Sequence, residues 1–243
     1  MAREGSRGLD SGERDLAFEE LWERERLLNA AVAQADAEGL ESCTVECLCA
    51  RAGVPGEAFR AHFQSVGECF EAACDSLMQQ LMARTISAYH APADSWIARV
   101  RAALSSYLRG VCARPEAARA YLLSPPNAPP APSEPAADGD LGTAWAAPRE
   151  RAIGLLEETI AEMLRDLPES EELGWVTVTG IAGGISRVVE RRVREGRTDE
   201  LADLLEPMLT WALMQLPEEV RPPEAEDHLL EEGERRGWEL LAG

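Results

Sequence analysis

The stretch from residue 44 to 63, TVECLCARAGVPGEAFRAHF, constrains the fold of this chain more than any other. Apolar residues recur at helical spacing on both sides of Gly53, and a proline follows two positions later. A glycine can take the left-handed conformation that ends a helix, and proline suits the start of the next one. The pattern predicts a helix-turn-helix whose second helix leaves Gly56, Glu57 and Arg60 outward, where a major groove would be met.

The residues around this motif extend the pattern on both sides. They are Leu27, Ala30, Ala31 and Gly39 before it, Thr44, Val45, Leu48, Ala52, Gly53, Val54, Phe59, His62 and Phe63 within it, and Ser65 and Glu68 after it. Together they resemble the N-terminal domain of TetR-type transcriptional regulators. The resemblance implies an all-α homodimer, with a three-helix head that binds a double-stranded DNA operator and a larger helical domain that binds an effector and dimerises. On this resemblance the candidate DNA contacts are Thr44, Pro55, Gly56, Glu57, Arg60 and His62.

The sequence departs from the family pattern within the second helix of the motif and just after it. Arg60 stands where the family usually has Tyr, and Val66 stands where it usually has Lys. Both of these positions commonly touch phosphate in the family. Glu57 replaces the favoured Gly, and Ala58 replaces the favoured Thr. Arg60 is therefore expected to be the main contact with phosphate or base.

Two functions remain open because the predicted head is acidic. From residue 44 to 70 three glutamates stand against two arginines, a net charge of −1, whereas a head that binds DNA is normally basic. The first hypothesis is a dimeric, ligand-controlled regulator, in the form of a repressor on a palindromic operator. The second is a TetR-like helical dimer with a degenerate head that binds a ligand or a protein partner but not DNA.

The composition limits the partners of the whole chain. A net charge of −20, from 44 acidic against 24 basic residues, repels polyanions, so DNA binding must come from local geometry. All 24 basic residues are arginines. The first 15 residues lack the apolar core of a signal peptide, and no later run is long enough to span a bilayer. We therefore expect a cytoplasmic protein without a membrane partner.

Cysteine and histidine are the residues that could carry metal or catalytic chemistry. Five of the six cysteines fall between Cys43 and Cys74, and buried thiols are the simplest interpretation. A metal or redox sensor built from Cys43, Cys47 and Cys74 is the alternative, although no Cys-x-x-Cys spacing supports it. The three histidines lie in different predicted segments. We expect no enzyme, no metal and no cofactor.

Changes in pattern along the chain predict its divisions. These are a flexible arm at residues 1–15, a helix-turn-helix domain at 16–68 whose first helix spans 18–38, an effector-binding and dimerisation domain at 69–217, and an acidic tail at 218–243 with a short helix near 229–241. A capping box of Ser65 and Glu68 opens the helix after the motif. The proline-rich run at 124–142 predicts a surface loop.

The larger domain supplies candidates for two further sites. Apolar and aromatic residues at helical spacing could line a pocket for a small apolar effector, although such residues are more often plain core. They are Trp96, Leu104, Tyr107, Tyr121, Met163 and Trp175. Small residues in a long helix predicted over 170–195, followed by an apolar stripe, predict a dimer interface, unless the glycines serve packing within one subunit. Its candidates are Gly180, Gly183, Gly184, Leu201, Leu205 and Met208.

Overall fold

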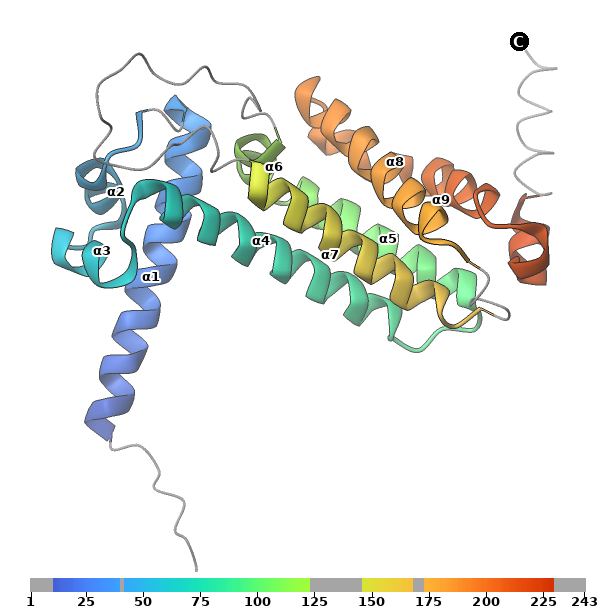
Figure 1. Cartoon of the computed structure of the whole chain (residues 1–243), viewed down its shortest axis with the longest axis horizontal. Helices are drawn as coiled ribbons and strands as arrows, with labels where there is room; N and C mark the ends of the chain where they lie inside the picture. The colour runs from blue at the N-terminus through green and yellow to red at the C-terminus, as the bar shows by residue number, and fades with distance from the viewer. Residues whose placement is uncertain (1–10, 40–41, 123–145, 168–172, 230–243) are drawn as a thin grey trace, which may run out of the picture. The chain divides into compact units, whose positions relative to one another are not determined.

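The computed structural model describes residues 11–39, 42–122, 146–167 and 173–229, with only the backbone at 11–17 and 146–149. All regular elements of these ranges are helices, so the all-α prediction is confirmed (Figure 1). The chain divides into two compact units, here called the head and the body. Among the described residues the head ends at Ala73 and the body begins at Cys74, five residues later than the predicted division.

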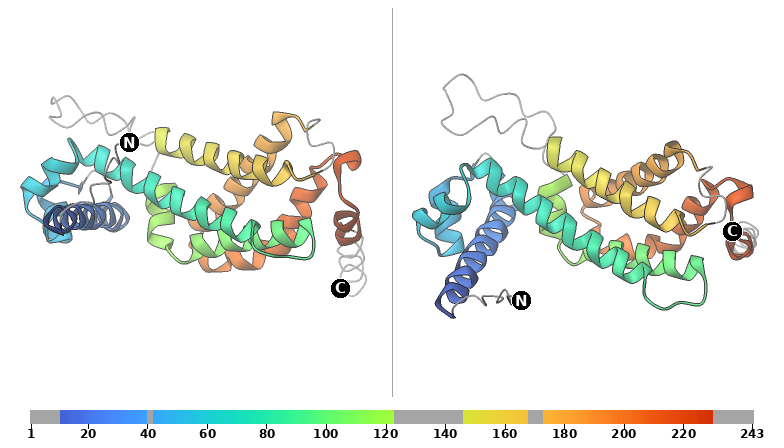
Figure 2. Two further views of the ribbon diagram at one scale, coloured as in Figure 1. Left: turned by 90° about the horizontal axis from the view of Figure 1, so that it is seen from below. Right: turned by 60° about the horizontal axis from the view of Figure 1, so that its bottom comes forward.

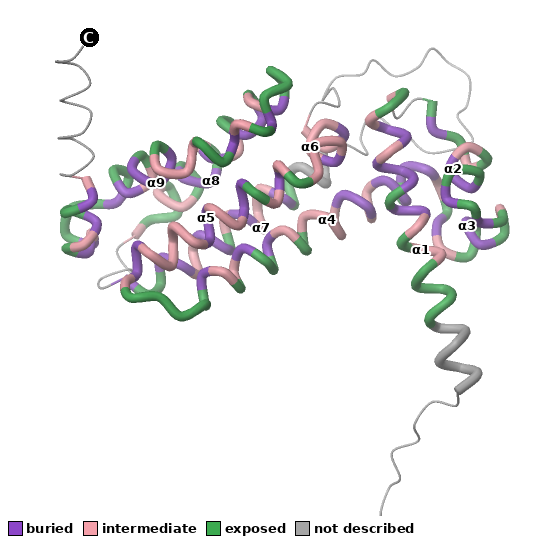
Figure 3. The backbone as a smooth tube through the Cα atoms, turned by 180° about the vertical axis from the view of Figure 1, so that it is seen from behind, coloured by how far each residue is buried: buried purple, intermediate pink, exposed green. Residues whose placement is uncertain are grey.

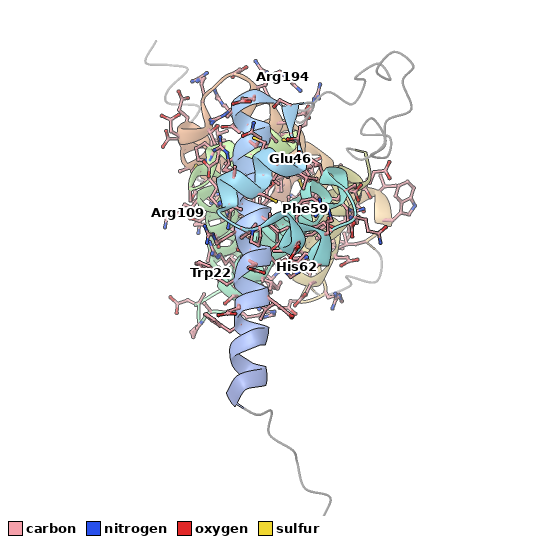
Figure 4. All side chains as sticks on the ribbon, turned by 90° about the vertical axis from the view of Figure 1, so that its left-hand side faces the viewer. Trp22, Glu46, Phe59, His62, Arg109 and Arg194 are labelled. Atoms are coloured by element: carbon pink, nitrogen blue, oxygen red, sulfur yellow. The ribbon has the colours of Figure 1, made fainter. Side chains whose placement is uncertain are left out.

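The head contains α1 (Ser11–Glu38), α2 (Val45–Ala52), α3 (Gly56–His62) and the start of α4 (Val66–Tyr89). Large apolar side chains from all four helices are buried in its core; they are Leu27, Leu48, Phe59 and Phe70. Figure 4 labels Phe59 among the side chains of this unit. The helix-turn-helix therefore rests on the apolar faces that the sequence predicted.

The first turns of α1 differ from the prediction. The helix begins at Ser11, so residues 11–15 of the predicted flexible arm are helical, and residues 1–10 lie outside the described part. Phe18 and Leu21 lie in these first turns of α1, and they are 70% and 64% exposed. Figure 3 shows α1 passing from buried to exposed toward its N-terminus. These turns extend beyond the part of α1 that packs on α2 and α3.

The turn of the motif has the predicted chemistry. The Thr44 hydroxyl accepts a hydrogen bond from the Cys47 amide at 3.2 Å and caps α2. Gly53 ends α2 in the left-handed conformation, with φ at 64°, and the Val54 amide donates to the Cys49 carbonyl at 3.1 Å. Pro55 is the residue just before α3, and Val54 is buried beneath the turn.

The capping box before α4 is confirmed. The Glu68 amide donates to the Ser65 hydroxyl at 3.1 Å, and the Glu68 carboxylate accepts from the Gln64 amide at 2.6 Å. The helix that it starts is continuous from Val66 to Tyr89 and so belongs to both units.

The body is built from α4, α5 and α7 running alongside one another, with α8 and α9 packed on them (Figures 1 and 2). Its elements after α4 are α5 (Trp96–Cys112), α6 (Pro115–Leu122), α7 (Ala146–Leu164), α8 (Trp175–Arg194), the 3-10 helix η3 (Thr198–Leu204), α9 (Leu205–Met214), the 3-10 turn η4 (Glu218–Val220) and a last helix at 223–229. The predicted loop at 124–142 lies outside the described residues.

Two boundaries in the body differ from the prediction. The long helix begins at Trp175 and not near residue 170, with Gly174 at its N-cap. The apolar stripe that follows is divided between two elements, because the 3-10 helix η3 begins at Thr198 and α9 begins only at Leu205. Pro207 explains the second difference, because a proline is tolerated in the first turn of an α-helix but breaks one in its interior.

The first part of the predicted acidic tail is packed into the body. Val220 and Ala225 are buried with the core of the body, and so is the His228 side chain. The His228 ring lies 3.1 Å from the Thr210 hydroxyl and 3.4 Å from the Arg101 guanidinium. The body therefore continues at least to residue 229, and the helix predicted near 229–241 lies almost wholly outside the described part.

A polar network joins the ends of α4, α5 and α7. The Tyr89 hydroxyl lies 2.7 Å from the Asp166 carboxylate, and Arg99 donates to the same oxygen at 2.7 Å. The Trp96 indole donates to the Met163 carbonyl at 3.0 Å. Hydrogen bonds from Tyr89 and Arg99 lower the pKa of Asp166, whereas burial and the Asp166 carboxylate raise the pKa of Tyr89. The network therefore links the ends of these three helices to one another.

Stability should therefore depend on pH through Asp166. A carboxyl with a lowered pKa in the folded state stabilises the fold above its unfolded pKa, and this contribution is lost as pH falls through the folded value. Asp166→Asn should lower the melting temperature at pH 7. The effect should be modest, because the Arg99–Asp166 ion pair is partly exposed. The difference between variant and wild type should shrink toward pH 3 in thermal melts. A constant difference across this range would contradict the assignment.

The cysteines of the head are mostly buried thiols. Burial raises the pKa of Cys43 to about 11 and that of Cys69 to about 12. Because the thiolate is the reactive form, both should resist alkylation. Iodoacetamide at pH 8 should label the half-buried Cys47 first and spare Cys43 and Cys69, until denaturant exposes all six cysteines. Mass spectrometry of tryptic peptides measures the order, and early labelling of Cys69 would contradict it.

Candidate DNA-binding surface and effector cavities

The outer surface of α3 carries most of the predicted DNA contacts. Pro55, Glu57 and Arg60 are exposed, and Gly56 is half-buried. The Arg60 guanidinium lies back along the helix, since a Cβ added to Gly56 would be 3.6 Å from its Nη1 atom. Thr44 is exposed too, although its hydroxyl is already used to cap α2.

Arg60 differs from the other described arginines of the head, each of which has a partner within it. Arg24 lies over the Phe63 ring and Arg26 over the Trp22 ring. Arg51 donates to the Gln34 amide oxygen at 3.1 Å. Within the described part Arg60 makes no hydrogen bond and no ion pair. Among the described arginines of the head, its guanidinium is therefore the one available to a ligand.

Two other positions of the motif face inward. The His62 side chain is only 14% exposed, and its Nε2 atom lies 4.0 Å from the carboxylate of Glu23 in α1. His62 therefore lies mostly under the outer surface of α3, and its role as a DNA contact stays a prediction. Val66 is buried at the start of α4. The cationic contact that the family usually has at that position is replaced by packing.

Two cavities lie in the described part of the body and are here called the inner and the outer cavity. The wall of the inner cavity is almost wholly apolar. Trp96, Leu104, Tyr107 and Met163, all predicted pocket residues, line it together with aliphatic side chains of α7, α8 and α9. Its two threonines, Thr85 and Thr159, donate their hydroxyls to carbonyls of their own helices at 2.9 and 2.7 Å.

The outer cavity is larger and has a more polar wall. Arg84, Gln80 and Ser186 line it beside apolar residues of α4, α5 and α7, and the predicted Tyr121 lines it from α6. Trp175, the last predicted pocket residue, is 76% exposed and lines neither cavity. The sequence did not identify Arg84 as a residue of the cavity wall. Its position does give a signal, because it follows Leu77 and Leu81 at helical spacing and so continues an apolar face of α4.

The residues predicted for a dimer interface fall into two groups. Gly180 and Gly183 are exposed on α8 and have no atom near the place of a Cβ. Gly184 instead packs inside the subunit, because a Cβ there would overlap the Trp211 ring. Leu201 and Met208 are buried in the core and Leu205 is half-buried, so they support the helices.

Large apolar side chains are exposed on α8 and α9 around the open glycines. They are Trp175, Val176, Val188, Trp211 and Met214. Exposed apolar patches of this kind mark interaction surfaces. Sequence spacing found the glycines of this surface but not its aromatic residues.

The described residues show no group of three or more Cys, His, Asp or Glu side chains that could hold a metal ion. None of their helices is long and apolar enough to cross a membrane.

Comparisons with known proteins show which structures share this architecture. No protein-family model matches the chain, and no curated protein matches it. Several solved structures do match the chain. FadR, the fatty acid degradation regulator of Bacillus halodurans, is 16% identical with a TM-score of 0.60, over 78% of this chain and 94% of its own. A TetR-family regulator from Syntrophomonas wolfei is 13% identical with a TM-score of 0.62, over 79% and 95%.

A third similar structure contains a ligand. FadR of Bacillus subtilis in complex with stearoyl-CoA is 14% identical to this chain, with a TM-score of 0.59 over 79% of this chain and 99% of its own. The matches cover both the head and the body of each regulator. The helix-turn-helix head and the hollow helical body thus form the fold of TetR-type transcriptional regulators.

Proposed function

We propose that this protein is a ligand-responsive transcriptional regulator that binds a palindromic DNA operator as a homodimer and acts as a repressor. The observation that carries the proposal is Arg60, an arginine exposed on the outer face of a helix-turn-helix and without a partner among the described residues. An arginine can bind phosphate or a guanine edge through two parallel hydrogen bonds. The amides at the start of α3 add a site for phosphate that needs no side-chain charge.

The effector site of the proposed regulator is the pair of cavities in the body. Their predominantly apolar walls favour a small molecule with a large apolar part. The similar FadR structure with stearoyl-CoA supports this choice of ligand class. Because α4 runs from the wall of both cavities into the head, an effector that shifts α4 would alter the spacing of two heads on DNA.

The dimer of the proposed regulator forms through α8 and α9. Gly180 and Gly183 leave room for another helix to approach, and α8 and α9 also carry the exposed Trp175 and Trp211. Two copies related by a twofold axis would cover the same patch on each subunit. A palindromic operator mirrors this symmetry.

The alternative is a degenerate head, and it also rests on a specific observation. The motif region has a net charge of −1, and its other arginine, Arg51, is bound to Gln34. Such a surface gains little from the release of counterions by DNA. On this alternative the protein is a helical dimer that binds a ligand or a protein partner.

Sequencing of DNA fragments retained by the purified protein tests the two proposals against each other. Genomic fragments are incubated with the protein at low salt, washed and sequenced, and fragments retained by an Arg60→Ala variant serve as the control. One enriched palindrome that the variant fails to retain supports the regulator. Retention without any shared sequence, or no retention, supports the degenerate head.

A further inference from the structure

The inner and the outer cavity follow one another along the same helices. On α5 the inner cavity is lined by Trp96, Leu104 and Tyr107, and the outer cavity is lined from Tyr107 onward to Val111. Leu156 of α7 also lines both. At 1.5 Å per residue, the segment of α5 from Trp96 to Val111 spans about 22 Å. One elongated molecule could therefore occupy both cavities, with Tyr107 beside its middle.

The inner cavity offers no hydrogen bond to a ligand. The hydroxyls of Thr85 and Thr159 are bound to backbone carbonyls, so these residues present methyl groups. The Trp96 indole donates to the Met163 carbonyl and is likewise satisfied. A polar group placed in this cavity would lose its hydration without compensation. The inner cavity selects an apolar chain.

Tyr107 is the polar group at the junction. Its side chain is 7% exposed, lines both cavities, and makes no hydrogen bond within the described residues. The hydroxyl oxygen is not sealed from solvent, so a group in the cavity can reach it. Burial raises the pKa of Tyr107 to about 12, so the group is a neutral donor at physiological pH. Its natural partner is a hydrogen-bond acceptor on the ligand.

Arg84 supplies the charge of the outer cavity. It is exposed at the wall, and no hydrogen bond or ion pair within the described part involves it. The other charged residues of that wall are engaged: Glu190 binds Arg187 and Arg194, and Arg114 lies 3.8 Å from Glu116. An exposed guanidinium without a partner in the described part, at the wall of an apolar cavity, favours an anion there.

We infer that the effector is an anionic acyl amphiphile that occupies both cavities at once. Its apolar chain fills the inner cavity, its acyl carbonyl accepts a hydrogen bond from Tyr107, and its anionic head binds Arg84. The inference rests on the proposed function only in treating these cavities as the effector site. It goes further by requiring a carbonyl and an anion at set positions, whereas shape alone would accept any apolar molecule.

Calorimetric titration with three probes of one chain length tests each requirement. The probes are palmitoyl-CoA, palmitate and hexadecane solubilised in cyclodextrin. Palmitoyl-CoA should bind most tightly. Palmitate carries its only charge on the carboxylate, which stands where palmitoyl-CoA has its acyl carbonyl. It should therefore bind well only if Tyr107 binds the carboxylate and Arg84 contributes little to the affinity. Tighter binding of palmitate than of palmitoyl-CoA would assign the site to free fatty acids, and equal binding of hexadecane would overturn the inference.

Two variants with a control separate the two contacts. Tyr107→Phe removes one hydroxyl and should weaken palmitoyl-CoA binding by about tenfold without lowering the melting temperature of the free protein, because that hydroxyl has no partner there. Arg84→Gln should weaken palmitoyl-CoA binding by about tenfold or more and leave hexadecane unaffected. Arg109→Gln makes the same charge change at an exposed position that lines neither cavity, and it should bind like wild type.

The outcomes for ligand and for DNA are independent. Unchanged palmitoyl-CoA affinity in both variants would overturn this inference even if the protein retains an operator. A protein that binds palmitoyl-CoA through both residues but retains no DNA would overturn the proposed regulator and leave the inference standing.

Discussion

Gly183→Leu should convert the proposed dimer into a monomer. Gly183 lies on the exposed face of α8 with no atom near the place of a Cβ, so the isolated subunit accommodates a leucine. Glycine inside a helix costs about 1 kcal/mol relative to alanine, which favours close approach of a partner as the reason for its presence. A leucine on the twofold-related face would hold both copies apart. Light scattering should give half the mass of the wild type.

Two other glycines make the test specific. Gly154→Leu places the same side chain on α7, also in open space, and should leave the dimer intact. Gly184→Leu would instead force the Trp211 ring out of its place within the subunit, and overpacking of this kind costs about 1–3 kcal/mol of folding stability. It should therefore lower the melting temperature, whereas Gly183→Leu should not. A dimeric Gly183→Leu variant would exclude this part of α8 from the interface.

The elements that could be predicted from the sequence depend on signals close together in the chain. The turn at Gly53 and the capping box of Ser65 and Glu68 each involve residues within about five positions, and backbone geometry alone decides them. The apolar faces of α2 and α3 are local in the same sense. The all-α fold follows from many such signals that agree with one another.

The details that escaped prediction depend on residues far apart in the chain. Spacing identified Gly184 as a small residue but not that Trp211 of another helix fills the space beside it. Spacing could not show that Gln34 holds Arg51, or that α1 extends beyond its partners and exposes Phe18. The two cavities likewise arise from the relative register of six helices, α4 to α9. Apolar periodicity is the same for a residue that lines a cavity and one that fills a core.

Arg60 decides whether the head binds DNA, and its removal should have the largest effect on operator binding. Arg60→Ala should cost about 1–3 kcal/mol per contact. If Arg60 reads a guanine edge, the loss should fall on one position of the operator and relax its specificity. If it binds phosphate, the affinity for all sequences should fall alike. Titrating the selected palindrome and single-base variants of it with both proteins distinguishes the two cases.

Salt dependence gives an independent measure of the same contact. The other described arginines of the head have partners within it, so a dimer would neutralise about two phosphates, and the slope of log affinity against log salt should be near −2. Arg60→Ala should flatten this slope, whereas Arg109→Ala in the body should leave it unchanged. Glu57→Gln should strengthen binding to every sequence, because Glu57 is exposed on the same face and repels phosphate. A steep slope that survives Arg60→Ala would show that other groups carry the DNA contact.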